Sequence, residues 1–206
     1  MNLSAVILAG GESRRMGTDK AWLEVGGQPL ITRALSALRA SGIQEVFISG
    51  RAGTDYSALR CPVLFDLEPG CGPVGGIERA LAAATAPLVL VLAVDLPCIT
   101  SAFLRKLAGH CDPLTGVVPK LRGALEPLAA IYPKRCGFIA RDCLLKSRRA
   151  AREFADACLH EHAVRTVAVS GVDARCFDNW NSPADVTLPV GRSLLNSDLK
   201  LHELTT

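Results

Sequence analysis

Apolar and polar residues follow two alternating patterns along this chain. Short apolar runs predict buried strands, and the stretches between them carry apolar residues three and four positions apart, as one face of a helix does. The predicted strands cover residues 5–8, 45–48, 62–65, 88–94, 116–119, 127–132 and 163–169. Helices are predicted from residue 30 to a close at 41–42, over 74–84, over about 101–108, and in two segments within 136–159. Strands that alternate with helices indicate an α/β fold with a parallel sheet.

Three local details refine this pattern. The run over residues 88–94 is apolar without interruption, which is typical of a strand buried on both faces. Thr100 or Ser101 is expected to cap the helix that follows. A basic stretch at 120–123 is expected to join two strands of the second half.

The composition limits the fold and the classes of partner. With 206 residues, 49% apolar and 21% charged, the chain is expected to form one domain over residues 1–188, followed by a tail at 189–206 without clear periodicity. A net charge of +3 does not favour a nucleic-acid or membrane partner. No apolar run approaches the roughly 20 residues of a membrane-spanning helix, and no signal peptide is visible, so we expect a cytoplasmic protein. The eight cysteines have no C-x-x-C spacing, which argues against a zinc or redox-dithiol site, and without a visible secretory signal we expect free thiols.

A glycine-rich, basic stretch over residues 8–20 follows the first predicted strand and reads LAGGESRRMGTDK. Gly10 and Gly11 have no Cβ, so a ligand can lie against their backbone N–H groups. Arg14, Arg15 and Lys20 add positive charge and hydrogen-bond donors. The stretch matches neither the P-loop nor the dinucleotide fingerprint. An ordinary turn with solvated charges is the alternative, but three cations within seven residues after a first strand favour a polyphosphate ligand.

The same stretch closely resembles the N-terminal motif of molybdenum cofactor guanylyltransferases, LAGGxSxRMGxDK. The resemblance extends over about residues 3–188 through two further motifs in the expected order. It implies a single-domain, Rossmann-like three-layer sandwich with a mostly parallel sheet, of the nucleotide-diphospho-sugar transferase type. It also implies a catalytic role for Arg15 and Lys20, and a nucleotide site that includes Leu8, Ala9, Gly10, Gly11 and Lys20.

Two carboxylates come directly after predicted strands, where ligands of open α/β sheets bind. Asp95 either caps the turn before Pro97 or binds Mg²⁺, which takes few carboxylates and completes its shell with waters and phosphates. The resemblance favours the metal, because the family has a D-x-P motif here whose Asp binds Mg²⁺ and belongs to the catalytic and nucleotide sites. Asp66 is either a nucleotide contact, as the family implies, or the first residue of a turn. The stretch 72–76 resembles the family's G-P-x-x-G and is expected to serve helix packing with some nucleotide contact.

A third motif, FDNWNSPAD over residues 177–185, resembles the family's F-x-N-x-N-T-P-x-D. Alternate residues of an extended segment face one way, so Asn179 and Asn181 can present two amides together. Amides both donate and accept hydrogen bonds, as the edge of a pterin requires. The resemblance places this segment on the molybdopterin side of the site. Ser182 and Pro183 also suit a turn and helix start, and both roles are compatible.

The reaction that the resemblance implies is transfer of GMP from GTP to the terminal phosphate of molybdenum-bound molybdopterin, with release of pyrophosphate. A phosphate monoester is already a nucleophile, so catalysis would come from positioning and charge neutralisation. Arg15 and Lys20 would neutralise phosphate oxygens, and Asp95 would hold Mg²⁺. The implied partners are the two substrates, with transient contacts to other cofactor-biosynthesis proteins and to recipient molybdoenzymes.

Several alternatives stay open. Ser49 stands where the family often has an Asn that contacts the nucleotide, which makes guanine selectivity less secure than the reaction type. A related enzyme that uses CTP or a sugar phosphate is the first alternative, and a catalytically silent nucleotide-binding module is the second. Glu126 is given no role. Arg148 and Arg149 could reach a substrate phosphate or lie on an exposed helix face.

Overall fold

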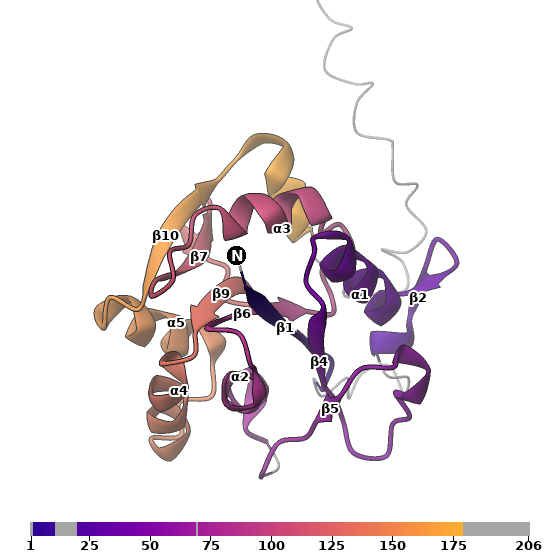
Figure 1. Ribbon diagram of the computed structural model, residues 1–206, viewed down its shortest axis with the longest axis horizontal. Coiled ribbons are helices and arrows are strands. Elements are labelled where there is room, and N and C mark those ends of the chain that lie inside the picture. Colours follow the sequence, from indigo (N-terminus) through magenta and orange to yellow (C-terminus); the bar gives the residue numbers. More distant parts are fainter. Residues whose placement is uncertain (1, 11–19, 69, 179–206) are drawn as a thin grey trace, which may run out of the picture.

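A mixed sheet forms the middle layer of the molecule (Figure 1). The structure is a computed structural model, and it describes residues 2–10, 20–68 and 70–178. In this part of the chain the strand order is β10-β7-β9-β6-β1-β4-β5, with β8 beside β7. The strands are β1 (Leu3–Leu8), β4 (Glu45–Ser49), β5 (Val63–Leu64), β6 (Leu88–Ala93), β7 (Gly116–Leu121), β8 (Ala124–Leu125), β9 (Ala129–Pro133) and β10 (Val164–Val169). Each strand predicted from the apolar runs is therefore confirmed.

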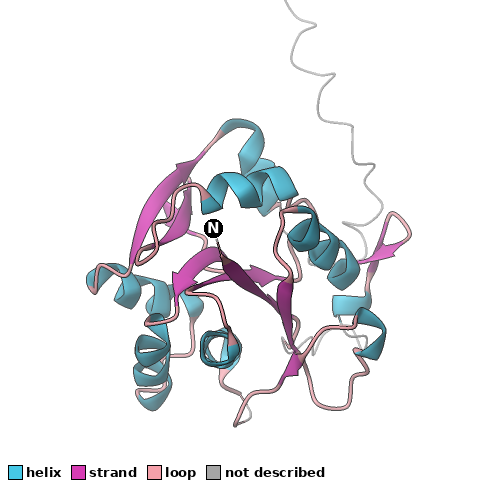
Figure 2. Ribbon diagram, viewed as in Figure 1, coloured by secondary structure: helices cyan, strands magenta, loops and turns pink. Residues whose placement is uncertain are grey.

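Helices cover both faces of this sheet and complete the three layers (Figures 1 and 2). One face carries α1 (Leu30–Ala40) and α3 (Ser101–Ala108), and the other carries α2 (Gly72–Ala83), α4 (Cys136–Leu145) and α5 (Ala151–His160). Thr100 is the cap of α3, because its Oγ1 accepts a hydrogen bond from the Phe103 N–H at 3.1 Å. No described helix is long and apolar enough to span a membrane.

The sheet is mostly parallel, as predicted. β1 pairs in parallel with β4 and β6, β4 with β5, and β7 with β10. β9 runs antiparallel to β6 and β7, and β8 runs antiparallel to β7. The parallel pairs bring the carboxyl ends of β1, β4, β5 and β6 to one edge of the sheet, where a ligand site is expected.

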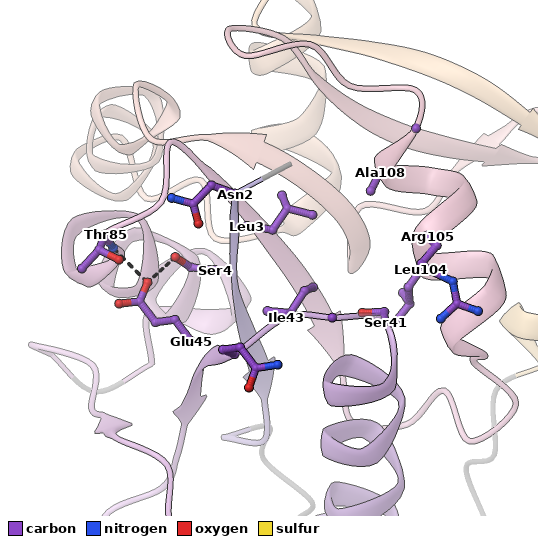
Figure 3. Close-up of a pocket in the computed structure, with 13 residues that line it drawn as sticks. Asn2, Leu3, Ser4, Ser41, Ile43, Glu45, Thr85, Leu104, Arg105 and Ala108 are labelled. Carbon is purple, nitrogen blue, oxygen red and sulfur yellow. Dashed lines mark hydrogen bonds between the residues drawn. The ribbon is translucent and has the colours of Figure 1, made fainter.

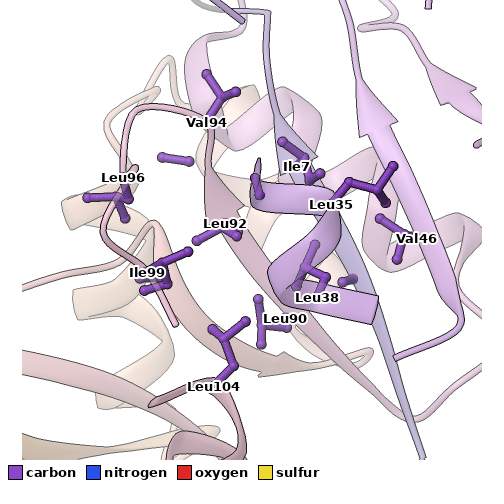
Figure 4. Packing of buried hydrophobic residues seen from close by; sticks show 14 of the residues in the cluster. Ile7, Leu35, Leu38, Val46, Leu90, Leu92, Val94, Leu96, Ile99 and Leu104 are labelled. Carbon is purple, nitrogen blue, oxygen red and sulfur yellow. The ribbon is translucent and has the colours of Figure 1, made fainter. Parts of the chain in front are cut away.

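Alternation of side chains along β1 and β6 produces two cores. Ile7, Leu90 and Leu92 face the layer of α1 and α3, where they pack with Leu35 and Leu104 (Figure 4). The intervening residues of the same strands face α2, α4 and α5. All six residues of β6 are buried, which confirms the prediction for the uninterrupted apolar run. Each large side chain so buried contributes about 1.5–3 kcal/mol to folding.

Six elements among the described residues were not predicted, and all but η3 have only two or three residues, too few to show a period. Those missed are η1 (Lys20–Trp22), β2 (Glu24–Val25), β3 (Gln28–Pro29), η2 (Ser57–Leu59), β8 and η3 (Gly171–Phe177). The basic stretch at 120–123 is also more ordered than expected. Lys120 and Leu121 belong to β7 and pair with β8 across a tight turn in which Arg122 and Gly123 both have positive φ, 49° and 86°. A two-residue hairpin turn with positive φ at both positions favours residues such as glycine, which explains why Arg122 and Gly123 interrupt the apolar pattern.

Candidate active site

The carboxyl ends of three neighbouring strands are fixed by hydrogen bonds that continue past the sheet. The Ala9 N–H donates to the Ser49 carbonyl at 2.9 Å, and the Val94 N–H donates to the Leu8 carbonyl at 3.2 Å. Gly10 leaves this edge exposed, and a Cβ there would stand 3.5 Å from the Gly50 carbonyl oxygen. The backbone of the predicted phosphate loop therefore starts at a rigid point of the fold. Gly11, Arg14 and Arg15 lie outside the described residues.

Lys20 and Asp95 meet at this edge. The lysine Nζ lies 3.1 Å from Asp95 Oδ2, and the side chains are 19% and 27% exposed. Lys20 opens η1, whose next residue, Ala21, is fully buried, and Trp22 stacks on Tyr56 with ring centroids 6.2 Å apart. An ion pair at this exposure contributes about 0.2–1 kcal/mol, so an incoming phosphate or metal ion can readily replace one partner.

Asp66 lies farther along the same edge, against the first turn of α2. A Cβ on Gly75 would stand 3.0 Å from Asp66 Oδ1, so the carboxylate approaches the helix backbone closely. Burial raises the pKa of the Asp66 carboxyl, and the charge of Arg79 opposes that rise. The carboxylate is still exposed to solvent on its other side. The structure thus places Asp66 at the sheet edge, after β5, whereas Asp95 follows β6.

Ser49 and Gly76 explain why α2 sits directly on the sheet. Ser49 is buried, and a Cβ added to Gly76 would overlap its Oγ and stand 2.9 Å from Leu8 Cδ2. Gly76 therefore allows α2 to pack closely on the sheet, which is the main role expected of the 72–76 stretch. A longer side chain at position 49 would have to displace α2. The Ser found here in place of the family's Asn fits this close approach.

The loop between α4 and α5 also reaches the start of α2. A Cβ on Gly72 would stand 2.9 Å from the Arg149 carbonyl oxygen, and one on Gly70 would stand 3.6 Å from Arg149 Nη1. Arg148 instead lines a groove between α4 and α5. The two adjacent arginines thus separate, and Arg149 approaches the loop after Asp66. Sequence reasoning could not find this contact, because more than seventy positions separate the two segments.

Glu126 lies between β8 and β9, at the same edge as Asp95. Its N–H donates to the Pro119 carbonyl at 2.9 Å, and the neighbouring Ala93 N–H, at the end of β6, donates to the Leu128 carbonyl at 2.7 Å. Burial raises the pKa of the Glu126 carboxyl, and the charge of Arg152 opposes that rise. A carboxyl with a raised pKa is suited to hold a proton, or to accept a hydrogen bond from a substrate, at the rim of a site.

The donor set fits Mg²⁺ in one specific way. No cluster of three or more His, Cys, Asp or Glu side chains occurs among residues 2–10, 20–68 and 70–178, so these residues form no all-protein cage. Mg²⁺ commonly uses one or two carboxylates and takes its other ligands from water and substrate phosphates. Asp95 is partly exposed, lies at the carboxyl end of a central strand, and can act as such a carboxylate.

The segment that leads to Asn179 and Asn181 is anchored on α3, although the two asparagines lie outside the described residues. Phe177 packs edge-to-face on Phe103 with ring centroids 5.4 Å apart, and the Lys106 Nζ donates to Asp173 Oδ2 at 2.6 Å. Asp178 follows and lies close enough to Cys98 for its charge to raise the pKa of that thiol. The last described residues thus approach the loop that carries Asp95.

A cavity of about 480 Å³ lies elsewhere, at the amino ends of β1 and β4 (Figure 3). Glu45 accepts hydrogen bonds from the Ser4 hydroxyl and from the Thr85 N–H, the latter at 2.9 Å. Burial alone would raise the pKa of Glu45, but these bonds lower it. This polar cluster ties β1, β4 and the turn before β6 together at the edge opposite Asp95, so it is structural support rather than part of the candidate site.

Comparisons with known proteins agree with this geometry. Residues 5–170 match the model of the MobA-like NTP transferase domain. A protein of Opitutus terrae named "probable molybdenum cofactor guanylyltransferase" is 38% identical over 186 residues, which cover 89% of this chain and 92% of that one. The molybdenum cofactor guanylyltransferase of Xanthomonas euvesicatoria is 40% identical over 105 residues, which cover 50% of this chain and 52% of that one.

Solved structures share the fold. Molybdopterin-guanine dinucleotide biosynthesis protein A of Archaeoglobus fulgidus superposes with a TM-score of 0.70 at 24% identity, covering 89% of this chain and 94% of that one. The 2-C-methyl-D-erythritol 4-phosphate cytidylyltransferase of Thermus thermophilus superposes with a TM-score of 0.69 at 21% identity, covering 90% and 96%. The predicted three-layer nucleotidyltransferase architecture is therefore confirmed.

Proposed function

Because this chain belongs to the MobA-like NTP transferase domain family, we propose that it transfers GMP from GTP to the terminal phosphate of molybdenum-bound molybdopterin. Family membership confirms the resemblance seen in the stretch over residues 8–20. Within this chain, the proposal rests on the contact of Lys20 with Asp95 at the sheet edge where Gly10 is exposed. A cation, a carboxylate and bare backbone within one sheet edge are what a nucleoside triphosphate and its metal require.

The phosphate of the acceptor would attack the α-phosphorus of GTP, and the bond to the pyrophosphate would break. At neutral pH a phosphate monoester is largely ionised, so no protein base has to remove a proton from it. Lys20 would neutralise phosphate oxygens as charge accumulates on them. Gly10 has no side chain, so the triphosphate could lie directly against its backbone. The protein's contribution is then orientation and electrostatics rather than covalent catalysis.

Asp95 would hold Mg²⁺ at the carboxyl end of β6. When bound there, the ion supplies positive charge to the phosphate oxygens of the donor. The existing Lys20 contact keeps the Asp95 carboxylate at the edge of the sheet and within reach of solvent, at 27% side-chain exposure. Asp66, Leu8 and Ala9 would complete the nucleotide side.

Arg15, Gly11, Asn179 and Asn181 lie outside the described residues, and their roles remain proposals from the family motifs. Arg15 would face the phosphates, and the two asparagines would bind the pterin. In support of that placement, the described chain reaches Asp178, whose charge raises the pKa of the Cys98 thiol, three positions beyond Asp95. Transient contacts with other cofactor-biosynthesis proteins and a cytoplasmic location follow from the proposed substrates.

The proposal is tested with the full chain, GTP, Mg²⁺ and molybdenum-loaded molybdopterin, by measuring pyrophosphate release and the dinucleotide product. We expect both, at rates that exceed those with CTP or UTP. No pyrophosphate with any nucleotide would contradict an enzymatic role, and faster reaction with CTP would select the cytidylyl alternative. Sugar phosphates in place of the pterin serve as acceptor controls, and turnover with them would redirect the assignment.

A further inference from the structure

Tyr56 lies in the loop between β4 and β5 and is buried, with 3% of its surface exposed. It lies outside the sequence motifs, but its ring contacts two segments of the candidate site. The ring stacks on Trp22, with centroids 6.2 Å apart and the ring planes at 24°. Trp22 ends the short helix η1 that Lys20 begins, so the Tyr56 ring supports the turn that carries the lysine.

An edge of the same ring packs on Gly50, the residue that follows β4. A Cβ on Gly50 would stand 2.5 Å from Tyr56 Cε2, so the missing side chain lets the ring lie directly on the backbone. The Tyr56 hydroxyl accepts a hydrogen bond from the Arg51 N–H at 3.2 Å, which fixes the next peptide as well. A Cβ on Gly10 would stand 3.5 Å from the Gly50 carbonyl oxygen, so Tyr56 holds the backbone beside the glycine-rich stretch.

The backbone on both sides of this contact is itself bound to the site. The Gly50 N–H donates to the Leu64 carbonyl at 3.0 Å, two positions before Asp66. The Leu23 N–H donates to the Lys20 carbonyl at 3.1 Å and so closes η1. Tyr56 therefore joins the turn that carries Lys20 to the loop that lies beside Gly10.

A tyrosine that only fills the core would lower stability when replaced, whatever residue stands at position 20. A tyrosine that positions the lysine has a further effect, which depends on the lysine being present. The two roles can therefore be separated by experiment.

We propose that Tyr56 is a positioning residue for Lys20, which it holds in a fixed place relative to the backbone at Gly50 and Gly10. The kinetic part of this inference rests on the proposed function, and the structural part does not. Tyr56 acts through Trp22 on one side and through Gly50 on the other, and it does not itself touch the phosphates. Without the ring, the ammonium group of Lys20 would spend less time where the phosphates bind.

A double-mutant cycle tests the proposal. Tyr56→Leu removes the stack and the hydroxyl, so we expect kcat/KM for GTP to fall about tenfold, because a catalytic cation is displaced. In the Lys20→Met background the same change should lower kcat/KM by less than about twofold, because the charge that Tyr56 positions is already gone. Tyr56→Phe keeps the stack and loses only the hydroxyl, so it should recover most of the loss.

Tyr132 provides the matched control, because it is a buried tyrosine of the other core. Its ring packs on Phe154 with centroids 4.9 Å apart, and its hydroxyl donates to the Pro127 carbonyl at 2.9 Å. Tyr132→Leu removes equivalent contacts, so urea denaturation should show a loss of stability similar to that of Tyr56→Leu. Any effect of Tyr132→Leu on kcat/KM should be the same with and without Lys20→Met.

Hydrogen exchange tests the structural part without turnover. In Tyr56→Phe the Arg51 amide loses its acceptor and should exchange about tenfold faster, while the Leu23 amide keeps the wild-type rate. In Tyr56→Leu both amides should exchange about tenfold faster, because η1 loses the ring that supports it. In Tyr132→Leu both should keep the wild-type rate. If wild type releases no pyrophosphate with any nucleotide, the proposed function fails, and this comparison still decides whether Tyr56 holds η1.

Three results would overturn the inference. One is an equal fold-loss of kcat/KM from Tyr56→Leu with and without Lys20→Met, which would make Tyr56 a core residue alone. Another is an unchanged exchange rate of the Leu23 amide in Tyr56→Leu. The third is a Tyr56→Phe variant as impaired as Tyr56→Leu, since that would assign the role to the hydroxyl rather than to the stack. If Tyr56→Leu fails to fold, Trp22→Leu removes the same stack at a half-buried position and goes through the same cycle with the same expectations.

Discussion

Lys20 Nζ and Asp95 Oδ2 stand 3.1 Å apart, although 75 positions separate the two residues in the sequence. The first residue belongs to the end of the glycine-rich stretch and the second follows the central strand β6. The pairing brings the end of the glycine-rich stretch to the carboxyl end of β6. In the free protein Lys20 and Asp95 pair with each other; a bound phosphate would replace Asp95 as the partner of Lys20, and a metal ion would replace Lys20 as the partner of Asp95.

Replacing Asp95 by Asn removes the carboxylate charge but keeps the shape of the side chain. Loss of a group that holds charge in the transition state costs about 10²–10³ in kcat, so we expect a fall of that size in pyrophosphate release. Asp142→Asn is the control, because Asp142 forms an exposed ion pair with Lys146 within one turn of α4. A wild-type rate in Asp95→Asn, measured alongside unchanged circular dichroism, would remove Asp95 from the mechanism.

Replacing Lys20 by Met keeps the aliphatic stem and removes the charge. The lost charge-assisted contact predicts that kcat/KM for GTP falls about 10- to 100-fold. Lys146→Met should leave kcat/KM unchanged, since Lys146 forms an ion pair with Asp142 in which both side chains are 56% exposed. Steady-state kinetics at several salt concentrations check both variants. Equal effects in the two would show that general surface charge, rather than this site, is responsible.

Adding a methyl group at Gly76 should destabilise the fold. A Cβ there would overlap Ser49 Oγ, so Gly76→Ala is expected to lower the free energy of unfolding by about 1–3 kcal/mol. Adding Ser49→Ala removes that oxygen and should recover part of the loss. Gly137→Ala is the matched control in α4, where the new Cβ would stand 3.7 Å from Leu81 Cβ; it should raise stability by up to about 1 kcal/mol. Urea denaturation measures all three, and equal losses at both glycines would refute the packing role.

The raised pKa of Asp66 predicts a pH effect on stability. Burial raises the pKa of this carboxyl above its ordinary 3.8, so the folded state binds the proton more tightly than the unfolded state. The stabilisation is complete below about pH 3.8 and is lost as pH rises through the folded-state pKa. Asp66→Asn should therefore gain in Tm relative to wild type between pH 4 and pH 7, on the order of a degree or two since the group is half-solvated. If the difference in Tm between Asp66→Asn and wild type became smaller from pH 4 to pH 7, folding would lower the pKa of Asp66 rather than raise it.

Most strands and the long helices could be predicted because their patterns extend over five or more residues, and the short β5 because it lies within the apolar run at 62–65. The elements missed, such as η1 and the hairpin of β2 and β3, are two or three residues long and carry no period. In the site, Lys20, Asp66 and Asp95 were found because each follows a strand or a motif. Arg33 was given no site role, and the role of Arg149 was left open. Their contacts with the loops after β6 and β5 depend on tertiary packing, which spacing along the sequence does not show. The close approach of α2 to Ser49 also depends on tertiary packing and has no signal in the sequence.

The pairing of β1 with β6 has a consequence for how the molecule gains activity during folding. Leu3 lies opposite Leu88, so this central parallel pair closes a very long loop and forms slowly compared with local helices. Lys20 cannot meet Asp95 until that pairing exists. Refolded chains should therefore acquire helical content first and turnover last, and the return of activity reports on completion of the sheet rather than on a local site.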